Sequence, residues 1–171
     1  MIFIKIIISI AILCITSYIG IEMARALKSR EQILTDMITF LKMVQNEMVY
    51  MLNNLPASYE MSRQKLNSEL KDVIGAIVVD MSKYGVDKID MSITNNVNTL
   101  VALKEYDKDI IISTLKNLGR SDLESQNNII ENAITIIEKQ IKEANEVKVK
   151  SSKVYKTVGI ISGLLIVVIF I

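Results

Sequence analysis

The chain has 171 residues with a formal net charge of +1, one Cys and no His, and half of the residues are hydrophobic. This near-neutral balance and a 5% aromatic content argue against nucleic-acid binding, and the lack of His removes the usual general base and the commonest metal ligand. No G-x-x-x-x-G-K-[ST] motif is present, which excludes a P-loop nucleotide site. We therefore predict a protein that is not an enzyme and needs no metal or cofactor.

The chain begins with an apolar segment, since no charged residue lies between Ile6 and Ile21. We predict an N-terminal transmembrane helix over residues 1–24. Cleavage as a signal peptide is disfavoured because Arg25 lies inside the candidate cleavage site. Ser17 and Gly20 form a small-residue patch that would let another membrane helix approach closely.

The next segment shows helical periodicity. Ser29 and Gln32 have the spacing of a helix cap, and Asp36, Lys42, Gln45 and Glu47 are assigned to the polar faces. The apolar positions recur every three or four residues and predict one buried seam: Leu34, Met37, Leu41, Val44, Met48 and Met51. The helix should end near Asn53–Asn54, and Pro56 suits the first turn of a short second helix.

Three further helices are predicted in the middle of the chain. The first is capped by Ser68 and ended by Gly85, and its buried side consists of Leu70, Val73, Ile74, Ile77, Val78 and Met81. The others span residues 90–103 and 105–118, the last with Ile110, Ile111, Leu115 and Leu118 inward. Acidic residues such as Asp107 and Asp109 have the spacing of solvated helix faces.

The last helix has the clearest start signal. Leu118–Gly119 closes the preceding helix, and Ser121, Asp122 and Glu124 form a capping box. Its predicted inner positions are Ile130, Ile134, Ile137, Ile141 and Ala144. No Gly or Pro interrupts residues 122–158, so this helix should run into a C-terminal transmembrane helix over residues 157–171.

The C-terminal segment is short for a membrane helix. Fifteen helical residues reach about 22 Å, against a hydrocarbon core of about 30 Å, so full crossing stays open. Gly159 and Gly163 have the GxxxG spacing that favours close packing of membrane helices.

Basic residues flank both apolar segments on the side of the middle domain. They are Arg25, Lys28 and Arg30 at the first segment and Lys148, Lys150, Lys153 and Lys156 at the second. By the positive-inside rule, residues 25–156 form a cytoplasmic helical domain. The predicted fold is all-α: a helical bundle with long first and last helices that are continuous with the N- and C-terminal membrane helices.

Two motif blocks resemble the stage III sporulation protein AB family. The first contains Arg30-Glu31-Gln32-Ile33, Glu47 to Tyr50, and Leu55-Pro56. The second contains Leu118-Gly119-Arg120-Ser121-Asp122, Gln126, Ala144, and Lys153-x-Tyr155-x-x-Val158-Gly159-x-x-x-Gly163. In the first block the family's later Ala-Leu is replaced by Tyr59 and Met61, and residues 71–103 match only in type of element.

The resemblance implies a platform component of the channel between mother cell and forespore, similar to the inner-membrane platform protein of type II secretion. The implied partners are other stage III sporulation channel proteins, including the separate cytoplasmic ATPase, stage III sporulation protein AA. We also expect contact with membrane lipid and self-association into a homo-oligomer. The implied location is the mother-cell membrane, that is the outer forespore membrane, with the helical domain in the cytoplasm.

The candidate partner or motif residues have structural interpretations as well. They are Arg30, Gln32, Glu47, Tyr50, Pro56, Gly119, Asp122 and Gln126. Helix ending and capping account for Gly119 and Asp122, and Gln126 is hypothesised to bond Glu47 or Tyr50 across the bundle. The alternatives to a platform are a membrane-anchored coiled-coil scaffold or regulator unrelated to secretion, a membrane enzyme using carboxylates, and a small pore-forming protein.

Overall fold

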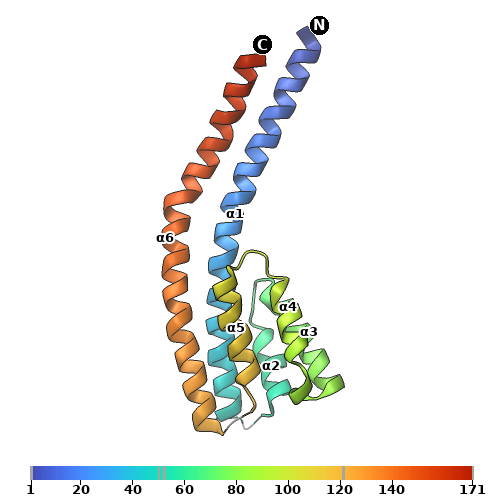
Figure 1. Ribbon diagram of the computed structural model, residues 1–171, viewed down its shortest axis with the longest axis vertical. Helices are drawn as coiled ribbons and strands as arrows, with labels where there is room; N and C mark the ends of the chain where they lie inside the picture. Colours follow the sequence, from blue (N-terminus) through green and yellow to red (C-terminus); the bar gives the residue numbers. More distant parts are fainter. Residues whose placement is uncertain (1, 50, 52, 121, 171) are drawn as a thin grey trace. The chain divides into compact units, whose positions relative to one another are not determined.

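The computed structural model describes the backbone of residues 2–49, 51, 53–120 and 122–170. Side chains are described within these ranges except at residues 2–10, 12, 13, 24, 152, 153, 155, 156, 159, 160 and 162–170. The elements are α1 (Ile2–Val49), α2 (Leu55–Arg63), α3 (Leu70–Tyr84), the short 3-10 helix η1 (Val86–Lys88), α4 (Asp90–Asn98), α5 (Glu105–Asn117) and α6 (Leu123–Phe170) (Figure 1). The described residues contain no strand, so the predicted all-α class is confirmed over them.

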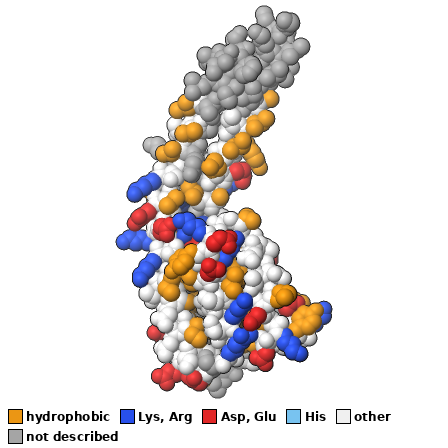
Figure 2. Space-filling model, in the orientation of Figure 1, with side chains coloured by type: hydrophobic (Ala, Val, Ile, Leu, Met, Phe, Trp, Pro, Cys, Tyr) orange, Lys and Arg blue, Asp and Glu red, His pale blue; other side chains and the backbone are white. Residues whose placement is uncertain are grey.

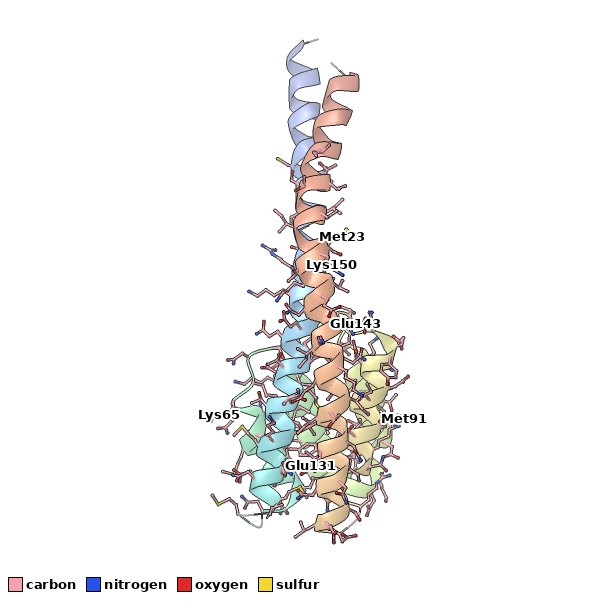
Figure 3. The ribbon with its side chains drawn as sticks, turned by 90° about the vertical axis from the view of Figure 1, so that its left-hand side faces the viewer. Met23, Lys65, Met91, Glu131, Glu143 and Lys150 are labelled. Carbon is pink, nitrogen blue, oxygen red and sulfur yellow. The ribbon has the colours of Figure 1, made fainter. Side chains whose placement is uncertain are left out.

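The chain divides into two compact units. Residues 30–142 form one, here called the bundle, and residues 1–29 with 143–171 form the other, here called the anchor unit. The two long helices, α1 and α6, contribute to both units. Within the bundle, α1 and α6 lie side by side in both ribbon views, and α2 to α5 complete the fold (Figures 1 and 3).

The bundle core forms around one broad face of α1. The predicted seam from Leu34 to Met48 is confirmed, since all five of its residues in that range are buried. Ile33 and Phe40 are also fully buried, which widens the seam because α1 is covered from more than one side. Met51 was predicted inside but is 62% exposed, since α1 ends at Val49 and its periodicity no longer applies.

The predicted inner faces of α3 and α5 are also confirmed. On α3 only Val78 is half-buried rather than buried, and on α6 the same holds for Ile134 and Ile141. The helix predicted over residues 90–103 ends at Asn98, and a turn follows. Leu100 and Leu103 are nevertheless buried, so the apolar pattern continues through irregular backbone.

Asp36 is a buried residue that the sequence pattern placed on a polar face. Its Oδ2 accepts hydrogen bonds from the backbone amides of Asn67 (2.8 Å) and Ser68 (2.7 Å), just before α3 begins. The prediction that the Ser68 hydroxyl caps α3 is wrong, because a carboxylate from α1 satisfies these amides instead. Asp36 thereby fixes the α2–α3 loop to α1.

Arg30 and Asp107 form a buried ion pair that joins α1 to α5. Arg30 Nε and Nη2 donate to the two Asp107 carboxylate oxygens at 2.7 and 3.0 Å. Nη2 also donates to Gln140 Oε1 on α6 at 3.1 Å, and the Lys104 amide donates to Asp107 Oδ2 at 3.0 Å. The prediction of a solvated face at Asp107 is wrong: this residue is 1% exposed, whereas Asp109 is exposed as expected.

The anchor unit consists of the first part of α1 and the last part of α6. Gly20 is buried and Ser17 half-buried, while Gly159 and Gly163 lie outside the residues described in side-chain detail. Several large apolar side chains are exposed: Ile15, Tyr18, Ile19, Ile21, Met23, Val149, Val154, Val158 and Ile161.

Over the described part of the chain, no helix is both long enough and apolar enough to cross a membrane. Residues 2–10 and 162–170, which make up much of the two predicted membrane segments, lie outside the described side chains. The membrane helices therefore stay a prediction.

Replacing Asp107 by Ala should destabilise the bundle by about 3–5 kcal/mol, because the buried Arg30 guanidinium would lose both of its hydrogen bonds to the Asp107 carboxylate. Asp109→Ala is the matched control on the same helix and should change stability by no more than about 0.5 kcal/mol. Denaturant unfolding of the full chain in detergent, followed by circular dichroism, measures both. Equal stability of the two variants would contradict a structural role of the ion pair.

Candidate functional site

The turn between α1 and α2 is held by Glu47. Its backbone oxygen accepts from the Asn53 amide at 3.1 Å, and its carboxylate accepts from Asn53 Nδ2 at 2.8 Å. Asn54 caps α2 by accepting from the Ala57 amide at 3.1 Å, and Pro56 lies in the first turn as predicted. Glu47 was assigned to a polar face but is buried, because the chain folds back over it at this turn.

The turn between α5 and α6 depends on Gly119. Leu118 ends α5, as predicted, and Gly119 follows with φ of +82°, a backbone region that side chains disfavour. The Gly119 amide donates to Gln126 Oε1 at 3.0 Å, so the side chain one turn into α6 holds the turn that precedes the helix. Gln126 is itself buried.

Asp122 caps the start of α6. Its Oδ1 accepts from the Ser125 amide at 3.0 Å, and its Oδ2 accepts from the Ser125 hydroxyl at 2.8 Å. The hydrogen bond from the Ser125 amide, followed by that from the Ser125 hydroxyl, lowers the pKa of the Asp122 carboxyl below its ordinary value, which favours the charged capping form. The predicted capping box assigned the cap to Ser121, which lies outside the described residues.

The two turns meet at one end of the bundle. A Cβ placed on Gly119 would lie 2.7 Å from Leu55 Cδ2 on α2, so the Leu55 side chain packs directly against this glycine. Nearby along the same helices, Gln45 Nε2 donates to Asn127 Oδ1 at 2.9 Å and joins α1 to α6. The part of the first sequence block around Leu55-Pro56 and the part of the second block from Leu118 to Gln126 therefore lie close together.

The predicted site residues fall into distinct places. Glu47, Pro56, Gly119, Asp122 and Gln126 belong to the two converging turns, whereas Arg30 belongs to the ion pair with Asp107. Gln32 is exposed on α1, and Tyr50 lies outside the described residues.

The hypothesis of a bond from Gln126 to Glu47 finds no support among the described residues. There the Glu47 carboxylate accepts from Asn53, and Gln126 accepts from the Gly119 amide. The alternative partner, Tyr50, lies outside them.

The sequence interpretation missed three structural residues: Asp36, Asn53 and Asp107. The burial of Asp36 and Asp107 could not be read from helical periodicity, and Asn53 is half-buried. A signal did exist for Asp107, because it stands three residues after the α5 N-cap, where a carboxylate often accepts the N-cap amide.

Two open hollows lie on the bundle surface. One, of about 240 Å³, lies between α5 and α6 and is lined by Ile110, Ser113, Thr114, Asn117, Ile129, Asn132, Ala133 and Ile136. The other, of about 230 Å³, is polar and is lined by Lys42, Gln45, Asn46, Val49 and Asn127. No group of three or more potential metal ligands is present among the described residues. Basic and acidic side chains are interspersed over the visible face of the bundle (Figure 2).

Replacing Gly119 by Ala should cost more than the roughly 1–2 kcal/mol of a left-handed backbone, because the new Cβ also meets Leu55. In a Leu55→Val background, where the neighbouring side chain is shorter, the same replacement should cost less. Thermal unfolding of the natural chain, the two single variants and the double variant measures the energetic coupling between Leu55 and Gly119. Strict additivity would show that the turn and α2 are not in contact.

Residues 5–171 match the family described as Stage III sporulation protein AB. No curated protein and no solved structure matches the chain. The matched range includes both converging turns, the Arg30–Asp107 ion pair and nearly all of the anchor unit. The chain belongs to the stage III sporulation protein AB family.

Proposed function

We propose that this sporulation protein is a membrane-anchored platform that binds other components of the mother cell–forespore channel and connects them to a separate cytoplasmic ATPase. The proposal rests on the role of the buried charged side chains of the bundle. Among the described residues, the four buried charged side chains are Arg30, Asp36, Glu47 and Asp107, and each binds a group that holds helices or turns in place. These four buried charged side chains thus serve to hold the fold together, which suits a scaffold.

The anchor unit supports the membrane part of the proposal. Exposed side chains such as Ile15, Ile19, Val154 and Val158 need an apolar environment or a partner. The apolar residues at both ends of the chain and the Lys and Arg residues beside them favour a bilayer with the bundle on its cytoplasmic side. Small residues such as Gly20 would then permit close packing of the membrane helices.

The proposed connection to a cytoplasmic ATPase rests on the family resemblance. A platform without a nucleotide site of its own takes energy from a partner, and stage III sporulation protein AA is the partner that the family resemblance suggests. The bundle offers a surface with mixed charge and no dominant sign, which suits contact with another protein rather than with nucleic acid (Figure 2).

The test uses an affinity-tagged full chain in sporulating cells, solubilised in detergent and probed for co-purified ATPase. We expect the ATPase to be retained by the natural chain and reduced several-fold by Gly159→Leu with Gly163→Leu, because larger residues would keep the membrane helices apart. Ile161→Leu is the control, since it alters the same segment without removing a small residue. Absence of the ATPase from the natural complex would contradict the proposal.

A further inference from the structure

Two hydroxyl groups of α2 are buried without a hydrogen-bond partner in the part of the chain that the structure describes. Tyr59 and Ser62 are both fully buried, and neither Tyr59 Oη nor Ser62 Oγ has a partner among the described residues. Ser68, in the loop that follows α2, is half-buried, but its Oγ is also buried and has no partner among the described residues. A buried hydroxyl without a partner has lost its hydrogen bonds to water and gained none, so it opposes closure of the segment that carries it.

Fewer apolar side chains are buried on α2 than on α3. Its buried residues are Leu55, Ser58, Tyr59 and Ser62, so half of them are serines. By comparison, α3 buries five apolar side chains: Leu70, Val73, Ile74, Ile77 and Met81. The short helix α4 buries two apolar residues, Ile93 and Val97, but carries no unpartnered hydroxyl. Few buried apolar contacts mark the parts of a protein that open first.

The ring of Tyr59 covers the core at Phe40 of α1. The two rings meet edge to face with their centroids 4.9 Å apart. Lys65, just after α2, lies at the outer edge of the bundle, so the segment has solvent on its far side (Figure 3). Outward movement of α2 would return the hydroxyls of Tyr59 and Ser62 to water and uncover Phe40.

We propose that α2 is a releasable cover of the bundle, which opens locally ahead of the other helices and exposes the Phe40 face of α1. The unpartnered hydroxyls of Tyr59 and Ser62 set how readily it opens. The cover remains closed at rest because Leu55, the Tyr59 ring and the Asn54 cap hold it. The Arg30–Asp107 pair and its contact with Gln140 involve no residue of α2, so opening of α2 leaves this link between α1, α5 and α6 intact.

Hydrogen–deuterium exchange of the full chain in detergent, read out on peptides from α2 and α3, tests the proposal. In the natural chain, residues 55–63 should exchange at least about tenfold faster than residues 70–84. Tyr59→Phe and Ser62→Ala should each slow exchange of α2 by about tenfold and raise the melting temperature, since each removes an unsatisfied group while keeping the helix.

The serines of α2 provide a matched control. Ser58 is as deeply buried as Ser62, but its Oγ donates to the Asn54 carbonyl at 3.0 Å. Ser58→Ala should therefore speed exchange of α2, opposite to Ser62→Ala. The exposed Tyr106 is the control for the tyrosine change, and Tyr106→Phe should leave α2 unaffected. If Tyr59→Phe and Ser62→Ala lower the melting temperature or leave α2 exchange unchanged, the hydroxyls are satisfied and the proposal is wrong.

Discussion

The bundle depends on one buried charge that its helices must neutralise together. Arg30 lies on α1, its counter-ion Asp107 on α5 and a further acceptor, Gln140, on α6. A guanidinium removed from water is costly unless its donors are matched, and the bidentate geometry here supplies the match. Since the same carboxylate accepts the Lys104 amide at the start of α5, a displacement of any of these helices would leave a buried charge or amide unpaired. The ion pair therefore specifies how α1, α5 and α6 pack.

Other polar side chains apply the same principle to the connections between helices. Asp36 fixes the loop before α3, Glu47 fixes the turn before α2, and Gln126 fixes the turn before α6. Asp36 and Gln126 accept hydrogen bonds from the backbone of an irregular segment, whereas the Glu47 carboxylate accepts from the Asn53 side chain. Side chains of α1 and α6 thus hold the irregular segments in place. Connections that are fixed in this way suit a protein that holds partners at defined positions.

Helical periodicity was enough to predict the all-α class, most of the α1 seam and the inner faces of α3 and α5. Turn chemistry was enough for Pro56 and Gly119, because a helix start and a left-handed backbone each demand a particular residue type. Periodicity failed for Asp36, Glu47 and Asp107, since a charged residue is assigned to solvent unless its partner is known. Those partners lie 31 residues from Asp36 and 77 residues from Asp107, which no local pattern can reveal.

The central claim is that the buried charges of the bundle serve its fold and that the protein acts as a scaffold. The most direct measurement replaces the ion pair by apolar side chains of similar size, Arg30→Met with Asp107→Leu, in the chromosomal copy. Such exchanges often preserve stability when both charges are removed together. If the doubly substituted chain is folded, as measured by circular dichroism, the account predicts normal yields of heat-resistant spores. A folded chain that leaves sporulation blocked would contradict the account, because the charges would then be required for chemistry or recognition beyond the fold.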